Sequence, residues 1–181
     1  DRVTQGHRVH GSGDHSIANA DAYETVLESA FVVADPAARA VRIRGQVESI
    51  AGQAGLTPVM PETLLEENAG LTEWPVSVVG SFDPAFLEVP EEALISSMQQ
   101  HQKCFPLRRP DGALADRFIA VANIDSRDPA AMTAGFERVI RPRLADARFF
   151  FEQDSQIDLD DARRRLDRAH DFALEQAPLL R

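Results

Sequence analysis

The segment CFPLRRPDGALADRFIAVANI, residues 104–124, decides the fold expected for this chain. The run Arg117–Ile124 is apolar and partly β-branched, which predicts a strand. Cys104–Arg109 predicts a second strand, and Pro106 indicates an edge position because proline has no N–H for a sheet ladder. Between them, Pro110-Asp111-Gly112 predicts a tight turn, since proline presets φ and glycine accepts a positive φ. The two strands are expected to form a β-hairpin.

Helical patterns surround this hairpin in the sequence. Asp35-Pro36 predicts a helix start with Asp35 as the N-cap, followed by a buried stripe of Val41, Val47, Ile50 and Ala51. Further helices are predicted near residues 20–31, 61–70, 91–103, 128–139 and 142–151, with another strand at 74–80. The predicted fold class is therefore α+β, with a small, mostly antiparallel sheet and packed helices. The expected divisions are an irregular N-terminal segment (1–18), an α+β domain (19–154) and a charged helical extension that is cut short (155–181).

Composition limits the function classes. The 181 residues carry a net charge of −10, which argues against a general nucleic-acid binder. The sign is uneven, because residues 1–100 hold 15 acids and 5 bases, whereas residues 101–148 hold 9 bases and 6 acids. The single cysteine excludes an internal disulfide and suits a reducing, cytosolic compartment. No apolar run is long enough for a membrane span. Both ends look like cuts, which predicts a piece of a longer polypeptide.

The basic cluster lies in FERVIRPRLADARFFFEQD, residues 136–154. Its four arginines are Arg138, Arg141, Arg143 and Arg148, and a triple phenylalanine at 149–151 follows them. On a helix, two or three guanidinium groups are expected to converge on one surface for an anionic partner such as RNA phosphate, with the phenylalanines buried against a core. The alternative is internal pairing, since Arg143 and Asp146 are spaced i,i+3, and Arg148 and Glu152 are spaced i,i+4.

A second polar cluster ends the predicted helix at 91–103. It contains Gln99, His101, Gln102 and Lys103, which could read polar groups of a ligand. A lone histidine is more often structural than catalytic, and Ser96 and Ser97 share its helix. The histidines at 7 and 10 are not expected to bind a metal, because zinc needs further ligands. No glycine-rich phosphate loop is present, and no catalytic residue is predicted.

Several long stretches carry a family resemblance. They are HRVHG (7–11), LLEENAGLTEWPVSVVGSFDPAFLEVPEEALISSMQQHQKCFPL (64–107), DRFIAVANIDSRDP (116–129) and GFERVIRPRLADARFFFEQD (135–154). In this order, they resemble the β subunit of the bacterial-type, two-subunit glycyl-tRNA synthetase. Cys104 departs from the pattern, since the family commonly has an aromatic residue there. After Asp154 the resemblance fades.

The resemblance implies a part of glycine–tRNA ligase, a cytoplasmic heterotetramer. In that family the α subunit activates glycine with ATP and Mg²⁺, and the β subunit supplies tRNA-binding domains. The fragment itself is expected to hold no cofactor or metal. Its implied partners are the α subunit, tRNA-Gly and other β-subunit domains, with no membrane. The implied fold is similar to the inserted α/β domain of the phenylalanyl-tRNA synthetase β subunit.

The resemblance also ranks the candidate residues. Gln102, Lys103, Arg141, Arg143 and the run 144–147 match the family motifs best, while Gln99, His101, Arg138 and Arg148 lie beside them. The leading hypothesis is a non-catalytic domain that binds or positions tRNA. One alternative is a structural domain that packs on the α subunit or on other β domains. Another is an editing deacylase centred on His101.

Overall fold

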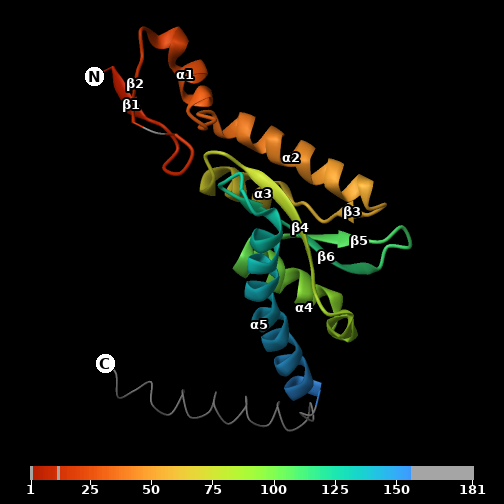
Figure 1. Ribbon diagram of the computed structural model, residues 1–181. Coiled ribbons are helices and arrows are strands. Elements are labelled where there is room, and N and C mark those ends of the chain that lie inside the picture. Colours follow the sequence, from red (N-terminus) through yellow and green to blue (C-terminus); the bar gives the residue numbers. More distant parts are fainter. Residues whose placement is uncertain (1, 12, 156–181) are drawn as a thin grey trace, which may run out of the picture.

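A four-stranded antiparallel sheet lies at the centre of the molecule, with helices on both faces (Figure 1). The computed structural model describes residues 2–11 and 13–155. The strand order is β3-β5-β6-β4. The strands are β3 (Thr57–Pro58), β4 (Val76–Ser81), β5 (Phe105–Arg108) and β6 (Leu114–Ala122). The expected α+β class with a small antiparallel sheet is confirmed.

The β5–β6 hairpin forms as expected. Gly112 takes a φ of 88°, and the Asp111 carboxylate accepts a hydrogen bond from the Ala113 N–H at 3.0 Å. The edge position expected from Pro106 is wrong, because β3 pairs with the outer side of β5. Pro106 lacks only a donor, and its carbonyl accepts a hydrogen bond from the Val59 N–H at 2.8 Å. A short strand that uses this carbonyl therefore fits beside the proline.

Helices α2 (Pro36–Gln53) and α3 (Glu62–Leu71) pack on the first face of the sheet. The Asp35 side chain caps α2 as expected, accepting from the Ala37 N–H at 2.9 Å. The fully buried positions of α2 are Ile43, Val47 and Ala51. Val41, expected in this stripe, is 71% exposed, because the buried residues follow a strict i,i+4 row that excludes it.

Elements that precede the β5–β6 hairpin in the chain and one helix that follows it cover the second face of the sheet. The elements are η2 (Pro84–Glu88), α4 (Glu91–Ser96), the π-helical turn η3 (Ser97–His101) and α5 (Pro129–Ser155). Their buried residues include Leu94, Met98, Ile140 and Leu144, which surround Phe118 of β6. A helix was expected to run unbroken from 91 to 103, and its second half is the π-helical turn instead.

Helix α5 is continuous through Pro142, although two separate helices were expected. A proline inside a helix removes one backbone hydrogen bond and weakens the turn before it. Here Ile140 and Leu144 flank the proline and are both almost fully buried. The Ser97 hydroxyl also donates to the Arg143 carbonyl at 3.2 Å. Packing on both sides of the proline therefore holds the helix together.

A small N-terminal unit projects from one end of the α+β domain (Figure 1). It consists of β1 (Val3–Gln5), β2 (Asp14–Ser16), η1 (Ala20–Ala22) and α1 (Tyr23–Ser29), where β1 and β2 form an antiparallel pair. The sequence predicted an irregular segment over residues 1–18, where β1 and β2 lie, and a helix near residues 20–31, where η1 and α1 lie. Side chains join the unit to the domain in a row of His7, His10, Phe31, Trp74 and Arg42.

This row, here called the ring ladder, has regular spacing. Its ring centroids are 5.1 Å apart from His7 to His10, and 5.2 Å apart at each of the next two steps. The Arg42 guanidinium lies 3.8 Å from the centre of the Trp74 ring. The His10 Nε2 accepts a hydrogen bond from the Asp125 N–H at 2.9 Å. Stacking and this hydrogen bond fix the N-terminal unit against the domain.

Candidate functional site: the two flanks of helix α5

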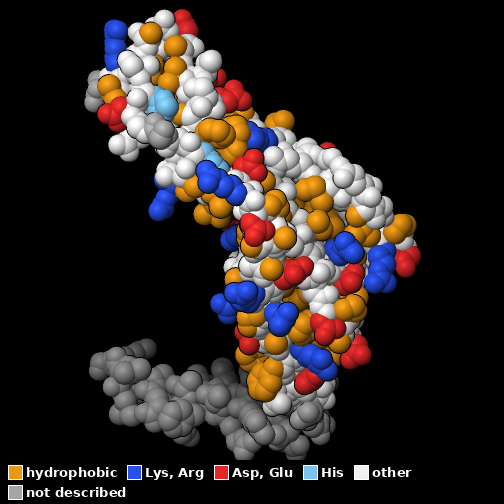
Figure 2. All heavy atoms as spheres, in the orientation of Figure 1, with side chains coloured by type: hydrophobic (Ala, Val, Ile, Leu, Met, Phe, Trp, Pro, Cys, Tyr) orange, Lys and Arg blue, Asp and Glu red, His pale blue; other side chains and the backbone are white. Residues whose placement is uncertain are grey.

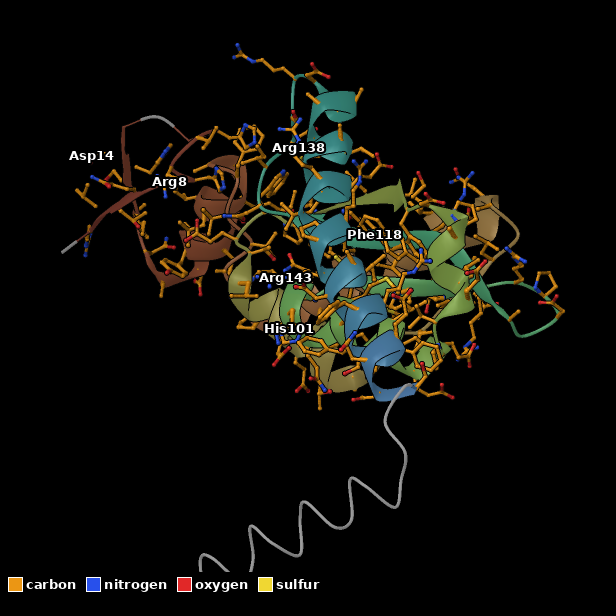
Figure 3. The ribbon with its side chains drawn as sticks, turned by 90° about the horizontal axis from the view of Figure 1, so that it is seen from below. Arg8, Asp14, His101, Phe118, Arg138 and Arg143 are labelled. Atoms are coloured by element: carbon orange, nitrogen blue, oxygen red, sulfur yellow. The ribbon has the colours of Figure 1, made fainter. Side chains whose placement is uncertain are left out.

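The arginines of α5 point in different directions. An α-helix turns about 100° per residue. Arg141 and Arg148, seven residues apart, therefore share one flank, whereas Arg143 lies on the opposite flank and faces η3. Arg138 points outward, on the side of α5 nearer the N-terminal unit (Figure 3). Arg138 is three residues before Arg141 and is rotated about 60° from it, so Arg138, Arg141 and Arg148 lie on one side of α5 and Arg143 lies on the other.

The flank with Arg141 and Arg148 is acidic. The Arg148 Nε lies 2.8 Å from the Glu152 Oε1, and this hydrogen bond raises the pKa of Arg148, with smaller contributions from the charges of Glu152, Glu88 and Asp83. Arg141 lines a recess of about 580 Å³ together with Asp83 and Glu137. Glu152 compensates the charge of Arg148, and Asp83 and Glu137 line the same recess as Arg141, so acidic side chains reduce the attraction for an anionic partner on this flank.

The opposite flank forms a groove against η3, here called the η3–α5 groove. Its volume is about 370 Å³. It is lined by Ala93, Ser96, Ser97, His101, Arg143, Asp146, Ala147 and Phe150. The expected pair of Arg143 and Asp146 is present, but its atoms are 3.8 Å apart and both side chains are more than half exposed. Such a pair is worth little, so the Arg143 charge stays available to a ligand.

The polar cluster at the end of η3 divides into structural and exposed residues. The Gln99 amide donates to the Val59 carbonyl at 3.1 Å. The Lys103 ammonium lies 2.8 Å from Glu67, and the Lys103 carbonyl accepts from the buried Asn68 amide at 3.0 Å. Gln99 and Lys103 therefore hold the fold together. Gln102 is half-buried, and His101 is exposed at the groove.

The three phenylalanines at the end of α5 are not buried. Phe149 is 56% exposed, Phe150 63% and Phe151 40%. The sequence predicted that they fix the helix to a core. The buried contacts of α5 end at Leu144, because the last turns of the helix extend past the sheet (Figure 1). Large exposed aromatic groups of this kind mark interaction surfaces more often than accidents of packing.

A residue that the sequence analysis did not select is Arg8. It lies in the turn after His7, whose Nδ1 accepts hydrogen bonds from the N–H groups of Val9 and His10, both at 3.2 Å. This turn leaves Arg8 exposed. The histidines on either side were the available signal, because a buried histidine can organise a tight turn.

Arg8 of the N-terminal unit and Arg138 of α5 are both exposed, and this pair of arginines is here called the concave face. Figure 2 shows lysine and arginine side chains along the left edge of the domain, below the overhanging N-terminal unit. Figure 3 shows Arg138 on the side of α5 that lies toward the unit carrying Arg8. Within residues 2–11 and 13–155, neither arginine has a carboxylate within 4.0 Å. Their charges are therefore uncompensated by neighbours in this part of the chain.

The geometry also bears on two other kinds of site, a serine–histidine hydrolytic site and a metal site. In the described part of the chain, no hydrogen bond joins His101 to Ser96 or Ser97, and the Ser97 hydroxyl donates to a backbone carbonyl instead. Among the same residues, no three histidine, cysteine, aspartate or glutamate side chains gather where a metal ion could bind. No described helix has the length and apolar character to cross a membrane.

Cys104 gives a pH-dependent prediction. Burial raises the pKa of its thiol from 9.0 to about 12. The unfolded thiol ionises above pH 9 while the folded thiol stays neutral, so stability is full below pH 9 and falls as pH rises toward 12. Between pH 7 and pH 10, we expect the free energy of unfolding to fall by about 1.4 kcal/mol more than in Cys104→Ala. Urea titrations at both pH values measure this, and equal losses in the two proteins would contradict it.

The comparisons with known proteins match nearly the whole chain. The family model described as glycyl-tRNA synthetase beta subunit covers residues 1–170. The chain belongs to this family. It is 46% identical over 166 residues to the glycine–tRNA ligase β subunit of Dichelobacter nodosus, covering 92% of this chain and 24% of that protein. The corresponding subunit of Psychromonas ingrahamii is 51% identical over 157 residues, covering 86% of this chain and 23% of the relative.

The family resemblance found in the sequence is therefore confirmed. The glycine–tRNA ligase β subunit of Alteromonas mediterranea gives the same picture, with 49% identity over 159 residues, 88% of this chain and 23% of the relative. This member of the glycyl-tRNA synthetase β family thus spans about a quarter of the length of the curated relatives it matches.

Proposed function

We propose that the chain is a tRNA-binding and tRNA-positioning part of a glycyl-tRNA synthetase β subunit. The relatives' names give glycine–tRNA ligase activity, and the proposal includes the use of ATP by the whole enzyme to charge tRNA-Gly. The observation that carries the proposal is the concave face, where Arg8 and Arg138 have no acidic partner among the described residues. Uncompensated guanidinium groups on an otherwise acidic protein favour the binding of a polyanionic ligand where they lie.

Further features follow from the proposed identity. The ATP and Mg²⁺ chemistry takes place on the α subunit, and this part of the β subunit holds no active site or cofactor. The enzyme is cytoplasmic, and its α subunit and other β domains are the protein partners. The fold is similar to the inserted α/β domain of the phenylalanyl-tRNA synthetase β subunit. An editing role for His101 is the weakest alternative, because neither neighbouring serine is hydrogen-bonded to it.

Removal of single charges tests the proposal. We expect Arg8→Gln and Arg138→Gln each to weaken tRNA-Gly binding about tenfold, the scale of one charge-assisted hydrogen bond. The slope of log affinity against log salt should become shallower by about 0.7–0.9 for each phosphate that is no longer neutralised. Arg148→Gln is the matched control, since its charge is already compensated by Glu152. Fluorescence anisotropy with labelled tRNA at several salt concentrations measures all four proteins.

Two results would count against tRNA binding. One is an affinity that does not change with salt. The other is an equal loss in the Arg148→Gln control, which would indicate a general electrostatic effect rather than binding at the concave face.

A second candidate function is packing on another protein surface. The exposed phenylalanines at 149–151 and Val139, which is 50% exposed, favour it. If this surface holds the α subunit, Val139→Ser should weaken co-purification of the two subunits while leaving tRNA affinity unchanged, because it adds no charge beside Arg138. Retention of the complex together with reduced tRNA affinity would reject the packing role for this surface.

A further inference from the structure

The η3–α5 groove combines a flat apolar ring with a cation. Phe150 is 63% exposed at one end of the groove, and Arg143 lies on the same flank of α5. The two residues are seven positions apart, so two helical turns separate them by about 10 Å along the axis. His101 and Ser96 line the facing wall. Figure 3 shows His101 beside Arg143, although they come from different elements.

The wall opposite α5 is fixed in position. The π-helical turn η3 carries His101, and its Met98 side chain is fully buried in the core. The Ser97 hydroxyl ties this turn to the Arg143 carbonyl of α5. Single π-helical turns occur frequently at functional sites, because the extra residue turns side chains out of the regular helical rows. The groove therefore exists before any ligand arrives.

The ring of Phe150 is also supported. Phe149 and Phe150 form a T-shaped pair, with ring centroids 5.7 Å apart and an angle of 71° between the planes. Phe149 itself is not part of the groove lining. An edge-to-face contact restrains both rings and covers at most one of the two faces of Phe150. The groove volume of about 370 Å³ falls within the range of small-ligand sites.

We propose that the η3–α5 groove binds one unpaired nucleotide of an RNA, with the base stacked on Phe150 and the phosphate paired with Arg143. The inference rests on the proposed function for the nature of the ligand and deepens it by naming single-stranded RNA. Aromatic faces stack on any base, and a guanidinium fork matches a phosphate. The Asp146 carboxylate accepts a hydrogen bond from a ribose hydroxyl or a base amino group. Bases within a duplex are stacked on each other and do not reach Phe150.

Matched leucine substitutions test the stacking. Phe150→Leu and Phe149→Leu both keep an apolar side chain but remove a flat ring. The probes are a short fluorescein-labelled oligouridine and a blunt-ended RNA duplex of the same length, each titrated with the full chain. We expect Phe150→Leu to weaken oligouridine binding about tenfold, the scale of one base–aromatic stack. We expect Phe149→Leu to change it less than about twofold, Phe150→Trp to preserve it, and duplex binding to stay the same in all three variants.

Any other outcome would overturn the assignment of an unpaired nucleotide to the η3–α5 groove. Equal losses in the two leucine variants, or an equal loss for the duplex, would show that the ring does not stack on an unpaired base. Reduced recovery of the α subunit with unchanged oligouridine binding would assign the phenylalanines to a protein interface instead. The proposed function is tested separately by Arg8 and Arg138. If tRNA binding depends on these arginines but oligouridine binding does not depend on Phe150, only the proposed ligand of the groove is rejected. If the wild-type chain binds neither the oligouridine nor the duplex, both proposals are rejected.

Discussion

Replacing Phe118 by alanine is expected to lower the free energy of unfolding by about 3–5 kcal/mol. Phe118 lies at the centre of the core on the second face of the sheet and is fully buried. Its cross-strand partner is Gly80 on β4, and a Cβ built on that glycine would lie 2.5 Å from the Phe118 Cζ. The ring therefore lies across the glycine and occupies the space that any other side chain would need.

A double-mutant cycle makes this prediction specific. Gly80→Ala alone should cost about 1–3 kcal/mol, because its methyl group meets the ring. In Gly80→Ala/Phe118→Ala the ring is absent, so the double variant should be clearly more stable than the sum of the single losses implies. Urea unfolding followed by circular dichroism gives all four values. Additive losses would show that the two positions do not share this space.

The second large effect is expected at Gly11. A Cβ there would lie 2.6 Å from the His7 nitrogen and 2.8 Å from the Ala30 oxygen, both backbone atoms that cannot rotate away. Gly11→Ala should therefore break the hydrogen bonds from the Gly11 N–H to the His7 carbonyl and from the His7 N–H to the Ala30 carbonyl. We expect a local loss of roughly 3 kcal/mol that opens the N-terminal unit and leaves the sheet folded.

The fluorescence of Trp74, the single tryptophan, reports this opening because its ring is part of the ring ladder. Hydrogen exchange at His7 separates local opening from global unfolding. Gly45→Ala is the matched control, since Gly45 is exposed in α2 and nothing lies within 4 Å of its built Cβ. This control should be stabilised by about 0.5–1 kcal/mol. An unchanged Trp74 signal in Gly11→Ala would contradict the prediction.

The features predicted correctly from sequence depend on neighbours in the chain. The Asp111-Gly112 turn and the Asp35 cap act within two or three residues, so the sequence contains all that determines them. Pro142 illustrates the opposite case. Its local effect is to end a helix, but the burial of Ile140 and Leu144 outweighs one missing hydrogen bond. That burial depends on the sheet, which local patterns do not place.

In the candidate site, too, the features set by chain neighbours were predicted and those set by tertiary packing were not. Helical spacing correctly paired Arg148 with Glu152 and Arg143 with Asp146. It could not show that α5 runs past the sheet and leaves Phe150 in solvent. Nor could it reveal the place of Arg8, because the contacts of the ring ladder fix the N-terminal unit against the domain and local patterns do not predict them.

The hydrogen bond from the Asn68 amide to the Lys103 carbonyl links the elements on the two faces of the sheet. Asn68 belongs to α3 on one face of the sheet, and Lys103 follows η3 on the other, in a left-handed conformation with a φ of 54°. A lysine rarely adopts this conformation without support from its surroundings. The residues at positions 68 and 103 should therefore change together in evolution. Where the asparagine at 68 is lost, selection should favour glycine at 103, because glycine adopts a positive φ without support. The shape of a surface on one side of the sheet is in this way constrained by a side chain from the other.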